Sequence, residues 1–344
     1  MSESRPTIAI TMGDVAGVGP ELVARVLLDP TTSTLCRPVV CGHPDILHRA
    51  LELHSNSREV VVVSDLSQAA ESNSDILCLA SGSDDLTEIE PGRVDARCGQ
   101  AAYDALIHAI DLALGGDVDG VVTAPLNKAA LHAAGIQYPG HTEILAERCE
   151  VSDFAMMLYL PPGSAVQGEF GLGVAHVTLH TSIRSVPDLL STEAIREKIR
   201  LMDSFLRQIG HPSPRIGVAA LNPHAGEEGL FGDEESRLIQ PAVEQEYALG
   251  TNVSGPIPAD ALMRRAAAGE FDGVVAMYHD QGHIALKLLG FDQAVNITLG
   301  LPIIRTSPSH GTAYDIAWQG QADVTGMQGA MVMACQLVKH QIQS

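Results

Sequence analysis

The sequence predicts an α/β protein of two domains. The chain has 344 residues, and because a domain typically has about 150 residues, this length predicts two domains. Short β-branched runs such as PTIAITM, EVVVVSD and VVTA alternate with amphipathic or polar stretches, as in helices packed on a mostly parallel sheet. Several runs end in Gly, Asn or His, and open α/β sheets bind ligands at the carboxyl ends of their strands.

The first elements are a strand at 6–12, the turn GDVAGVG and a helix from about Glu21. A strand, a turn and a helix start can hold an anion, but the spacing is not GxGxxG, so a Rossmann dinucleotide site is not predicted. PVVCG, EVVVVSD and ILCLA predict three further strands, and a helix is expected at 99–116, where paired glycines end it.

The next elements carry the first dense group of polar residues. After VVTA, a helix is expected to start near Lys128, and the turn YPGHTE presents His141 and Thr142. FAMMLYL and VAHVTLH predict two strands, and on the second of them His176 and His180 would point to the same side.

Two later strands end in histidine. RIGVAALNPHAG places His224 after a strand, and VVAMYHD places His279 and Asp280 after another. Asp260 falls at an expected helix N-cap, where capping alone is a sufficient explanation.

Composition narrows the class of partner. A net charge of -21 and a pI near 4.9 argue against nucleic acid and anionic membranes, which need a basic surface. No apolar run approaches the length of a membrane span and no charged leader precedes an apolar core, so we expect a cytoplasmic location. The six cysteines form no CxxC pair, which favours free thiols and directs any metal site to histidine.

Three histidines at strand ends are candidate metal ligands, namely His180, His224 and His279. Three neutral imidazoles with an open position suit catalytic Zn²⁺ or a related divalent ion. Three unrelated polar strand ends would give the same pattern, so spacing alone leaves both interpretations open. The cations Lys287 and Arg305, together with the neutral groups of Thr142 and Asn296, suit a phosphate or carboxylate. These features predict a small hydroxylated substrate that carries an anionic group.

The chain resembles the 4-hydroxythreonine-4-phosphate dehydrogenase (PdxA) family of pyridoxal phosphate biosynthesis. The similarity covers nearly the whole sequence, through the ordered motifs GDVAGVGPEL, TAPLNKAALHAAGIQYPGHTE, LHTSIRSVP, LNPHAGEEGLFG, GPIPAD, MYHDQGH, LKLLGF, VNITLGLPIIRTSPSHGTAYDIA and GQAD. Departures from the family pattern are Val15 in place of a proline, and Pro308 and Ser309 in place of Val-Asp.

The resemblance implies a two-domain α/β/α fold like that of isocitrate and isopropylmalate dehydrogenases, with the active site in the interdomain cleft. One domain would be 1–135 plus 305–344, and the other, 136–304, would carry the metal ligands and the dimer interface. It also implies a homodimer in which one of the three metal histidines comes from the partner subunit. The implied metal ligands are His180, His224 and His279, and the implied substrate contacts are His141, Thr142, Lys287, Asn296 and Arg305.

The implied reaction uses NAD or NADP and one divalent ion (Zn²⁺, Mg²⁺ or Co²⁺). It oxidises the C3 hydroxyl of 4-hydroxy-L-threonine 4-phosphate, and decarboxylation then gives 3-amino-2-oxopropyl phosphate. The cofactor is expected near Asn296 to Asp315. Asp260, Asp280 and Lys128 are candidates for the base that takes the hydroxyl proton.

Other substrates and activities stay open. QGHIALKLLGF, with His283, is closer to relatives that oxidise D-threonate or D-erythronate 4-phosphate. HVTLHTSIRS is similar to relatives that oxidise a cis-dihydrodiol. More distant alternatives are a phosphate acyltransferase on the same broad fold, which would not need three metal histidines, and a noncatalytic sensor of phosphorylated ligands.

Overall fold

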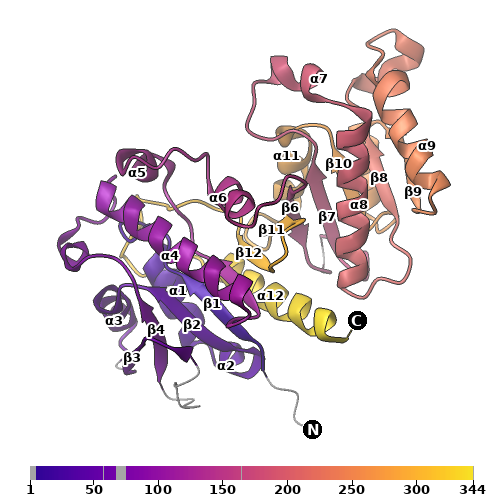
Figure 1. Ribbon diagram of the computed structural model, residues 1–344. Helices are drawn as coiled ribbons and strands as arrows, with labels where there is room; N and C mark the ends of the chain where they lie inside the picture. Colours follow the sequence, from indigo (N-terminus) through magenta and orange to yellow (C-terminus); the bar gives the residue numbers. More distant parts are fainter. Residues whose placement is uncertain (1–4, 57, 67–74, 164, 344) are drawn as a thin grey trace. The chain divides into compact units, whose positions relative to one another are not determined.

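The computed structural model describes residues 5–56, 58–66, 75–163 and 165–343. It divides into two compact units, which we call the terminal unit (Met1–Val151 with Leu301–Ser344) and the central unit (Ser152–Gly300) (Figure 1). The sequence-based boundaries were 135/136 and 304/305. The observed division lies later at the first boundary because Ile144 and Leu145 pack in one apolar cluster with Leu106 and Leu131.

The terminal unit contains a parallel sheet. Its strands lie in the order β3-β4-β2-β1-β5-β12. Ile10, at the centre of this sheet, lies opposite Val40 on one side and Val122 on the other. All three side chains are fully buried, which explains the uninterrupted apolar runs in the sequence. The strand bounds are β1 Thr7–Thr11, β2 Arg37–Gly42, β3 Val60–Val63, β4 Ile76–Ala80, β5 Gly120–Thr123 and β12 Arg305–Pro308.

Helices of the terminal unit begin and end at residues suited to those positions. The long helix α4 begins at an Asp95 N-cap and ends at Gly116, whose φ of +79° is left-handed. It packs against β1 and β2, and α12 packs against β5 and β12. The helix bounds are α1 Gly19–Leu28, α2 Pro30–Leu35, α3 Pro44–Leu53, η2 Asp84–Glu88, α4 Ala96–Gly115, α5 Lys128–Ala133, α6 His141–Arg148 and α12 Thr325–Gln343.

The central unit contains a mixed sheet. Its strands lie in the order β11-β6-β7-β10-β8-β9. Strand β6 pairs antiparallel with both β11 and β7, and the other neighbouring pairs are parallel. The predicted strand VAHVTLH is only partly confirmed, because β7 ends at His176. His180 lies beyond the strand, so the inference that both histidines share one strand face is wrong. The bounds are β6 Ala155–Leu160, β7 Leu172–His176, β8 Ile216–Ala219, β9 Val253–Ile257, β10 Gly273–Ala276 and β11 Val295–Leu299.

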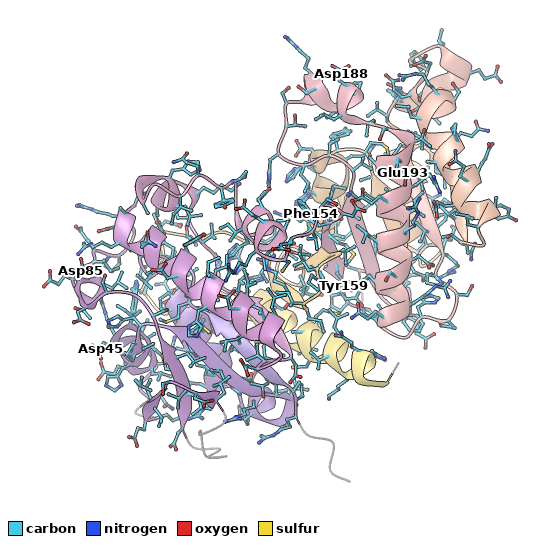
Figure 2. All side chains as sticks on the ribbon, viewed as in Figure 1. Asp45, Asp85, Phe154, Tyr159, Asp188 and Glu193 are labelled. Carbon is cyan, nitrogen blue, oxygen red and sulfur yellow. The ribbon has the colours of Figure 1, made fainter. Side chains whose placement is uncertain are left out.

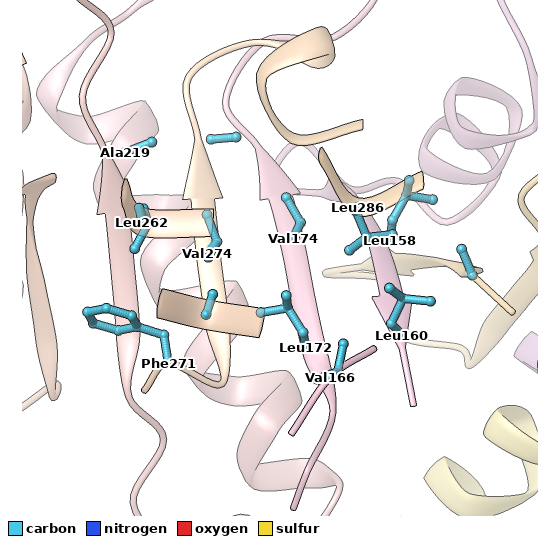
Figure 3. Packing of buried hydrophobic residues seen from close by; sticks show 13 residues of the cluster. Leu158, Leu160, Val166, Leu172, Val174, Ala219, Leu262, Phe271, Val274 and Leu286 are labelled. Atoms are coloured by element: carbon cyan, nitrogen blue, oxygen red, sulfur yellow. The ribbon is translucent and has the colours of Figure 1, made fainter. Parts of the chain in front are cut away.

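Helices cover both faces of this sheet. Leu262, Phe271 and Leu286 belong to a buried cluster with Val174 and Val274, which places α10 and α11 on one face (Figure 3). On the other face a Cβ at Gly273 would lie 2.5 Å from Cγ of Met202, so glycine lets α8 approach closely. The bounds are η3 Ile183–Ser185, α7 Val186–Leu189, α8 Thr192–Gln208, η4 Pro223–Gly229, η5 Glu235–Ile239, α9 Gln240–Ala248, α10 Ala259–Ala267 and α11 His279–Gly290.

Figure 2 draws the described side chains as sticks on the ribbon and labels Asp45 of α3 and Glu193 of α8. Asp45 and Glu193 lie in the first turns of α3 and α8, where a negative charge stabilises the positive end of the helix dipole. All six cysteines are free thiols, as expected. Among the helices that the structure describes, none is long and apolar enough to cross a membrane.

Candidate active site

Arg305 provides a buried cation in the terminal unit. It is the first residue of β12, lies opposite Val121 of β5 and is 1% exposed. Its Nη2 donates a hydrogen bond of 2.6 Å to Oγ1 of Thr123, the last residue of β5. Burial lowers the pKa of Arg305 to about 9, so the guanidinium is still protonated at neutral pH. A buried cation of this kind is suited to an anionic ligand.

His141 and Thr142 open helix α6. The sequence predicted a turn here, but His141 is the first helical residue and Gly140 is the N-cap, so that prediction is wrong. Thr142 is buried in the first turn, where backbone amides have no acceptor within the helix. Burial, and then the charge of Arg305, hold the pKa of His141 well below its ordinary value. The neutral imidazole therefore does not add to the positive charge.

Lys128 lies beside the same helix start. It is the first residue of α5, after an Asn127 N-cap whose side chain accepts from the Ala130 amide at 3.1 Å. A Cβ at Gly140 would lie 3.8 Å from Cε of Lys128, so the lysine stem is adjacent to the start of α6. The terminal unit thus brings together the cationic or polar side chains of Lys128, His141, Thr142 and Arg305, a combination suited to a phosphate.

The first glycine-rich motif packs against the segment after β12. Oδ2 of Asp14 accepts from the Tyr314 hydroxyl at 2.7 Å, and the Val18 amide donates to Thr312 O at 2.9 Å. Asp14 is fully buried, and burial raises the pKa of its carboxyl despite the hydrogen bond from Tyr314. Sequence reasoning singled out both motifs but not the Asp14–Tyr314 contact, because the two residues are 300 positions apart.

His180 and His279 line one cavity in the central unit. Their ring centroids are 6.1 Å apart, and the cavity of about 500 Å³ is lined by Leu179, His180, Thr181, Ser182, Ile183, Val186, Tyr278, His279 and Asp280. Nδ1 of His279 lies 2.7 Å from Oδ1 of Asp280. A proton on Nδ1 shared with this carboxylate leaves the lone pair on Nε2, which is the arrangement that metal-binding histidines use. Two of the three expected metal ligands therefore come together within one chain.

His224 is not among the residues that line the cavity of His180 and His279. It begins a left-handed run, His224 to Glu228, with φ values between 42° and 77°. The carboxylate of Glu235 accepts hydrogen bonds from the amides of Leu221 and Asn222 at 2.8 and 2.7 Å and so fixes the start of the turn. Over the residues that the structure covers, no group of three or more potential metal-ligating side chains occurs within one chain. The described residues of one chain thus do not bring the three expected ligands together.

Helix α11 presents three of the singled-out residues at intervals of four, namely His279, His283 and Lys287. Such spacing puts them on one face of the helix. The His283 ring stacks on His279, with centroids 3.8 Å apart and planes at 14°. Burial, and then the charges of His176 and His279, lower the pKa of His283 to about 2, so it is neutral. Burial also lowers the pKa of Lys287.

The remaining candidates are dispersed in the central unit. Asn296 is the second residue of β11, not a strand end, and its Oδ1 is buried with no hydrogen-bond partner in the described part of the chain. Asp260 lies in the first turn of α10, after a Pro258 N-cap, so its predicted capping position is wrong. Asp260 and Asp280 are both exposed to solvent. Asp280 contacts the candidate metal ligand His279.

Known proteins support the motif-based assignment. A profile of the family described as "Pyridoxal phosphate biosynthetic protein PdxA" matches residues 34–334. The chain is 43% identical to D-threonate 4-phosphate dehydrogenase of Salmonella typhimurium, over 96% of this chain and 98% of that protein. It is also 43% identical to 4-hydroxythreonine-4-phosphate dehydrogenase of Trichlorobacter lovleyi, over 98% of this chain and 99% of that protein.

A solved structure gives the same result for the fold. The crystal structure of 4-hydroxythreonine-4-phosphate dehydrogenase from Klebsiella pneumoniae matches with a TM-score of 0.83 and 44% identity, over 97% of this chain and 99% of that one. Coverage of this extent includes both units of the chain. The chain belongs to the PdxA family of pyridoxal phosphate biosynthetic proteins.

Proposed function

We propose that this chain oxidises the C3 hydroxyl of a 4-phosphorylated hydroxy acid, with NAD or NADP as hydride acceptor. The observation that carries the proposal is the buried cation Arg305 beside the start of α6, in a chain whose net charge is -21. A guanidinium offers a planar fork of donors that matches carboxylate and phosphate oxygens, so this buried cation is suited to an anionic substrate. The names of the relatives supply the class of anion, a hydroxy acid with a phosphate at position 4.

Two substrates fit this description. The first is 4-hydroxy-L-threonine 4-phosphate, whose oxidation transfers a hydride from C3 to the nicotinamide and a proton to a base. Loss of CO₂ from the resulting 3-oxo acid gives 3-amino-2-oxopropyl phosphate. The second is D-threonate 4-phosphate, which has a hydroxyl in place of the amino group. Its support is the 44% identity to the Pectobacterium atrosepticum D-threonate 4-phosphate dehydrogenase and the presence of His283.

The anion-binding roles divide between charge and hydrogen bonding. In the terminal unit Arg305 would supply charge and a fork of donors, and Thr142 a hydroxyl and its first-turn amide. His141 would contribute a neutral donor. In the central unit Lys287 would supply a point charge, and the buried Oδ1 of Asn296 would accept from a substrate hydroxyl or amine.

We also propose that His180 and His279 hold a divalent metal ion, Zn²⁺, Mg²⁺ or Co²⁺. Their rings line one cavity, and Asp280 leaves the His279 lone pair on Nε2. When bound, such an ion would polarise the substrate hydroxyl oxygen. Because His224 lies outside this pair, we propose that the third ligand is His224 of the partner subunit. Asp280, Asp260 and Lys128 are the candidates for the base that accepts the hydroxyl proton.

A dimer through the central unit would supply that ligand. Helix α11 and its C-cap expose an apolar stripe formed by Ile284, Leu288 and Phe291, which are 57%, 84% and 48% exposed. A stripe of this kind favours a protein partner over water. It lies on the helix that also carries His279, so a second copy that covered it would approach the proposed metal ion.

The cofactor is proposed to bind along the segment from Asn296 to Asp315. Nε2 of His310 is buried and has no hydrogen-bond partner among the described residues. Apart from its own chain neighbours, no described residue has an atom within 4 Å of where a Cβ at Gly311 would stand, which leaves room for a ligand. The segment is anchored at Thr312, where its carbonyl accepts from Val18, so a bound dinucleotide would meet a fixed backbone.

Nicotinamide reduction by the purified protein tests the activity. Each of 4-hydroxy-L-threonine 4-phosphate, D-threonate 4-phosphate and D-erythronate 4-phosphate is offered with NAD⁺ and with NADP⁺, before and after metal removal by a chelator. We expect turnover of at least one substrate and its loss on chelation. No reduction with any of the three in metal-replete protein would refute the proposed activity.

Subunit complementation tests the shared metal site. His279→Ala and His224→Asn each remove one ligand, so either variant alone should be inactive. If the ligands come from both subunits, a mixed dimer of the two variants keeps one intact site, and random reassortment recovers about a quarter of full activity. If all ligands come from one chain, every mixed dimer has two damaged sites and no activity returns.

A further inference from the structure

A pair of buried histidines lies behind His279 in the central unit. His176, the last residue of β7, is 1% exposed, and His283, one turn along α11 from His279, is 5% exposed. Nδ1 of His283 lies 3.1 Å from Nε2 of His176, so the two rings share a hydrogen bond. Neither imidazole lines the cavity of His180 and His279, so neither is placed to touch a substrate there.

The pair restricts the His279 ring in the direction that Asp280 does not. The hydrogen bond between Nδ1 of His279 and Asp280 acts in the plane of the ring and fixes its rotation. The stacking of His283, at 3.8 Å and 14°, acts perpendicular to that plane and fixes its tilt. With both contacts in place, Nε2 of His279 points in one direction. A ligand oriented in advance loses less conformational freedom when it binds a metal ion.

The local sequence is arranged so that the two histidines can meet. His176 lies opposite Ala276 in the parallel pairing of β7 with β10, and α11 begins three residues after Ala276. A Cβ at Gly282 would lie 2.5 Å from Nε2 of His176, so a glycine is needed for the helix to approach that ring. Two apolar side chains would fill the same space without the cost of burying polar rings.

We propose that His283, held by its hydrogen bond to His176, is a positioning residue for His279 and raises the affinity of the metal site. This inference rests on the proposed role of His279 as a metal ligand. Removing a partner behind a metal ligand typically costs about 10- to 100-fold in metal affinity. We expect a loss of that size in His283→Leu and in the His176→Leu/His283→Leu double variant, because the His283 ring is the one that stacks on His279.

The experiment is a Co²⁺ titration of the metal-free full-length protein, followed by visible absorbance and by thermal unfolding. The variants are His283→Leu, His176→Leu, the double variant and His279→Ala. His211→Leu is the matched control, because it removes a partly buried histidine of the same unit, one that contacts Asp272 and Phe170 instead of α11. The double variant replaces the polar pair with an apolar one, so it keeps a folded protein available even if a single variant is unstable.

The outcomes separate the inference from the proposed function. Weakened Co²⁺ binding in His283→Leu and the double variant, with unchanged binding in His211→Leu, supports the positioning role. If His279→Ala loses Co²⁺ but both His283 variants bind it as tightly as the unchanged protein, the inference is overturned and the proposed function stands. If His279→Ala itself binds Co²⁺ normally, the metal role of His279 fails, and the inference fails with it.

Discussion

Replacing Arg305 by methionine should make the protein more stable and less able to bind its substrate. Burial lowers the pKa of Arg305 to about 9, compared with about 12.5 for an exposed arginine. A basic group whose pKa is lower in the folded state than in the unfolded state lowers the free energy of unfolding. That cost has its full size at any pH below the folded-state pKa. The destabilisation disappears as the pH rises through the interval between the two pKa values. At neutral pH the whole cost is therefore present.

The magnitude follows from the same numbers. At about 1.4 kcal/mol per pKa unit, the cost of the buried charge is at most about 5 kcal/mol. The substitution also removes the 2.6 Å hydrogen bond to Thr123 and leaves that hydroxyl buried. This loss offsets about 2 kcal/mol of the stability gained. A net gain of about 2–3 kcal/mol corresponds to a rise in Tm of about 3–6 °C. Loss of a charge-assisted fork to phosphate should lower kcat/KM about 10²- to 10³-fold.

The assay is thermal unfolding of Arg305→Met in phosphate-free buffer, with and without added inorganic phosphate, together with steady-state kinetics. We expect a higher Tm without phosphate, a smaller phosphate-induced shift and little change in the KM of the dinucleotide. Arg93→Met is the control, since Arg93 is an exposed arginine of the same unit paired with Glu90. A lower Tm in phosphate-free buffer, or an unchanged phosphate shift, would refute the reasoning.

Three further predictions concern metal, assembly and pH. His224→Asn tolerates the left-handed backbone but removes the imidazole, so kcat should fall at least about 100-fold with little change in Tm. Leu288→Glu puts a charge on the exposed stripe of α11, so sedimentation should show a monomer, with activity lost. Burial raises the pKa of Asp272, but hydrogen bonds from Arg215 outweigh it and hold that pKa below its ordinary value. The stability from Asp272 is therefore present above about pH 4 and lost as the pH falls through the folded pKa. Asp272→Asn should cost about 2–3 kcal/mol at pH 7 and flatten the acid limb of a Tm–pH curve.

Each of these has a control and a contrary result. His48→Asn, on the exposed surface of α3, should leave kcat unchanged, and an active His224→Asn would exclude that imidazole from the mechanism. Leu114→Glu changes a partly exposed leucine of the terminal unit, and a dimeric Leu288→Glu would place the interface elsewhere. For Asp272→Asn, a Tm that still falls as steeply as in the unchanged protein on acidification would show that other carboxylates dominate.

The sheets were predictable because their strands are short apolar runs between glycines and polar residues. PTIAITM, PVVCG, ILCLA and FAMMLYL all became strands, and the helix expected at 99–116 became α4, because local apolar periodicity and glycine stops agree with the tertiary packing there. VAHVTLH gave a wrong strand end because its alternation of β-branched and other residues continues past His176. Beyond that residue the chain leaves the strand, and the Thr178 hydroxyl bonds to Met277 O at 2.9 Å. That contact joins positions 99 apart, which local sequence does not reveal.

The candidate site was predictable in its residue types and only partly in its arrangement. Chemistry singled out Arg305, His180 and His279, and the structure shows that the first is buried and that the other two line one cavity. The His176–His283 contact could not be predicted from the sequence, because it depends on the register of β7 with β10 and on the close approach that Gly282 allows. The left-handed backbone conformation of His224 could not be predicted either, because the positive φ of a non-glycine residue is imposed by its surroundings.

In the left-handed run from His224 to Glu228, selection for stability and selection for turnover favour different residues. Four of its five residues are not glycine, and each costs roughly 1 kcal/mol in that conformation, so the native sequence is locally far from its most stable choice. Glycine at Ala225 or Glu227 would remove part of that cost, and it would also free the backbone that holds His224. Directed evolution for heat resistance should therefore accumulate glycines in this turn, whereas evolution for turnover should remove them.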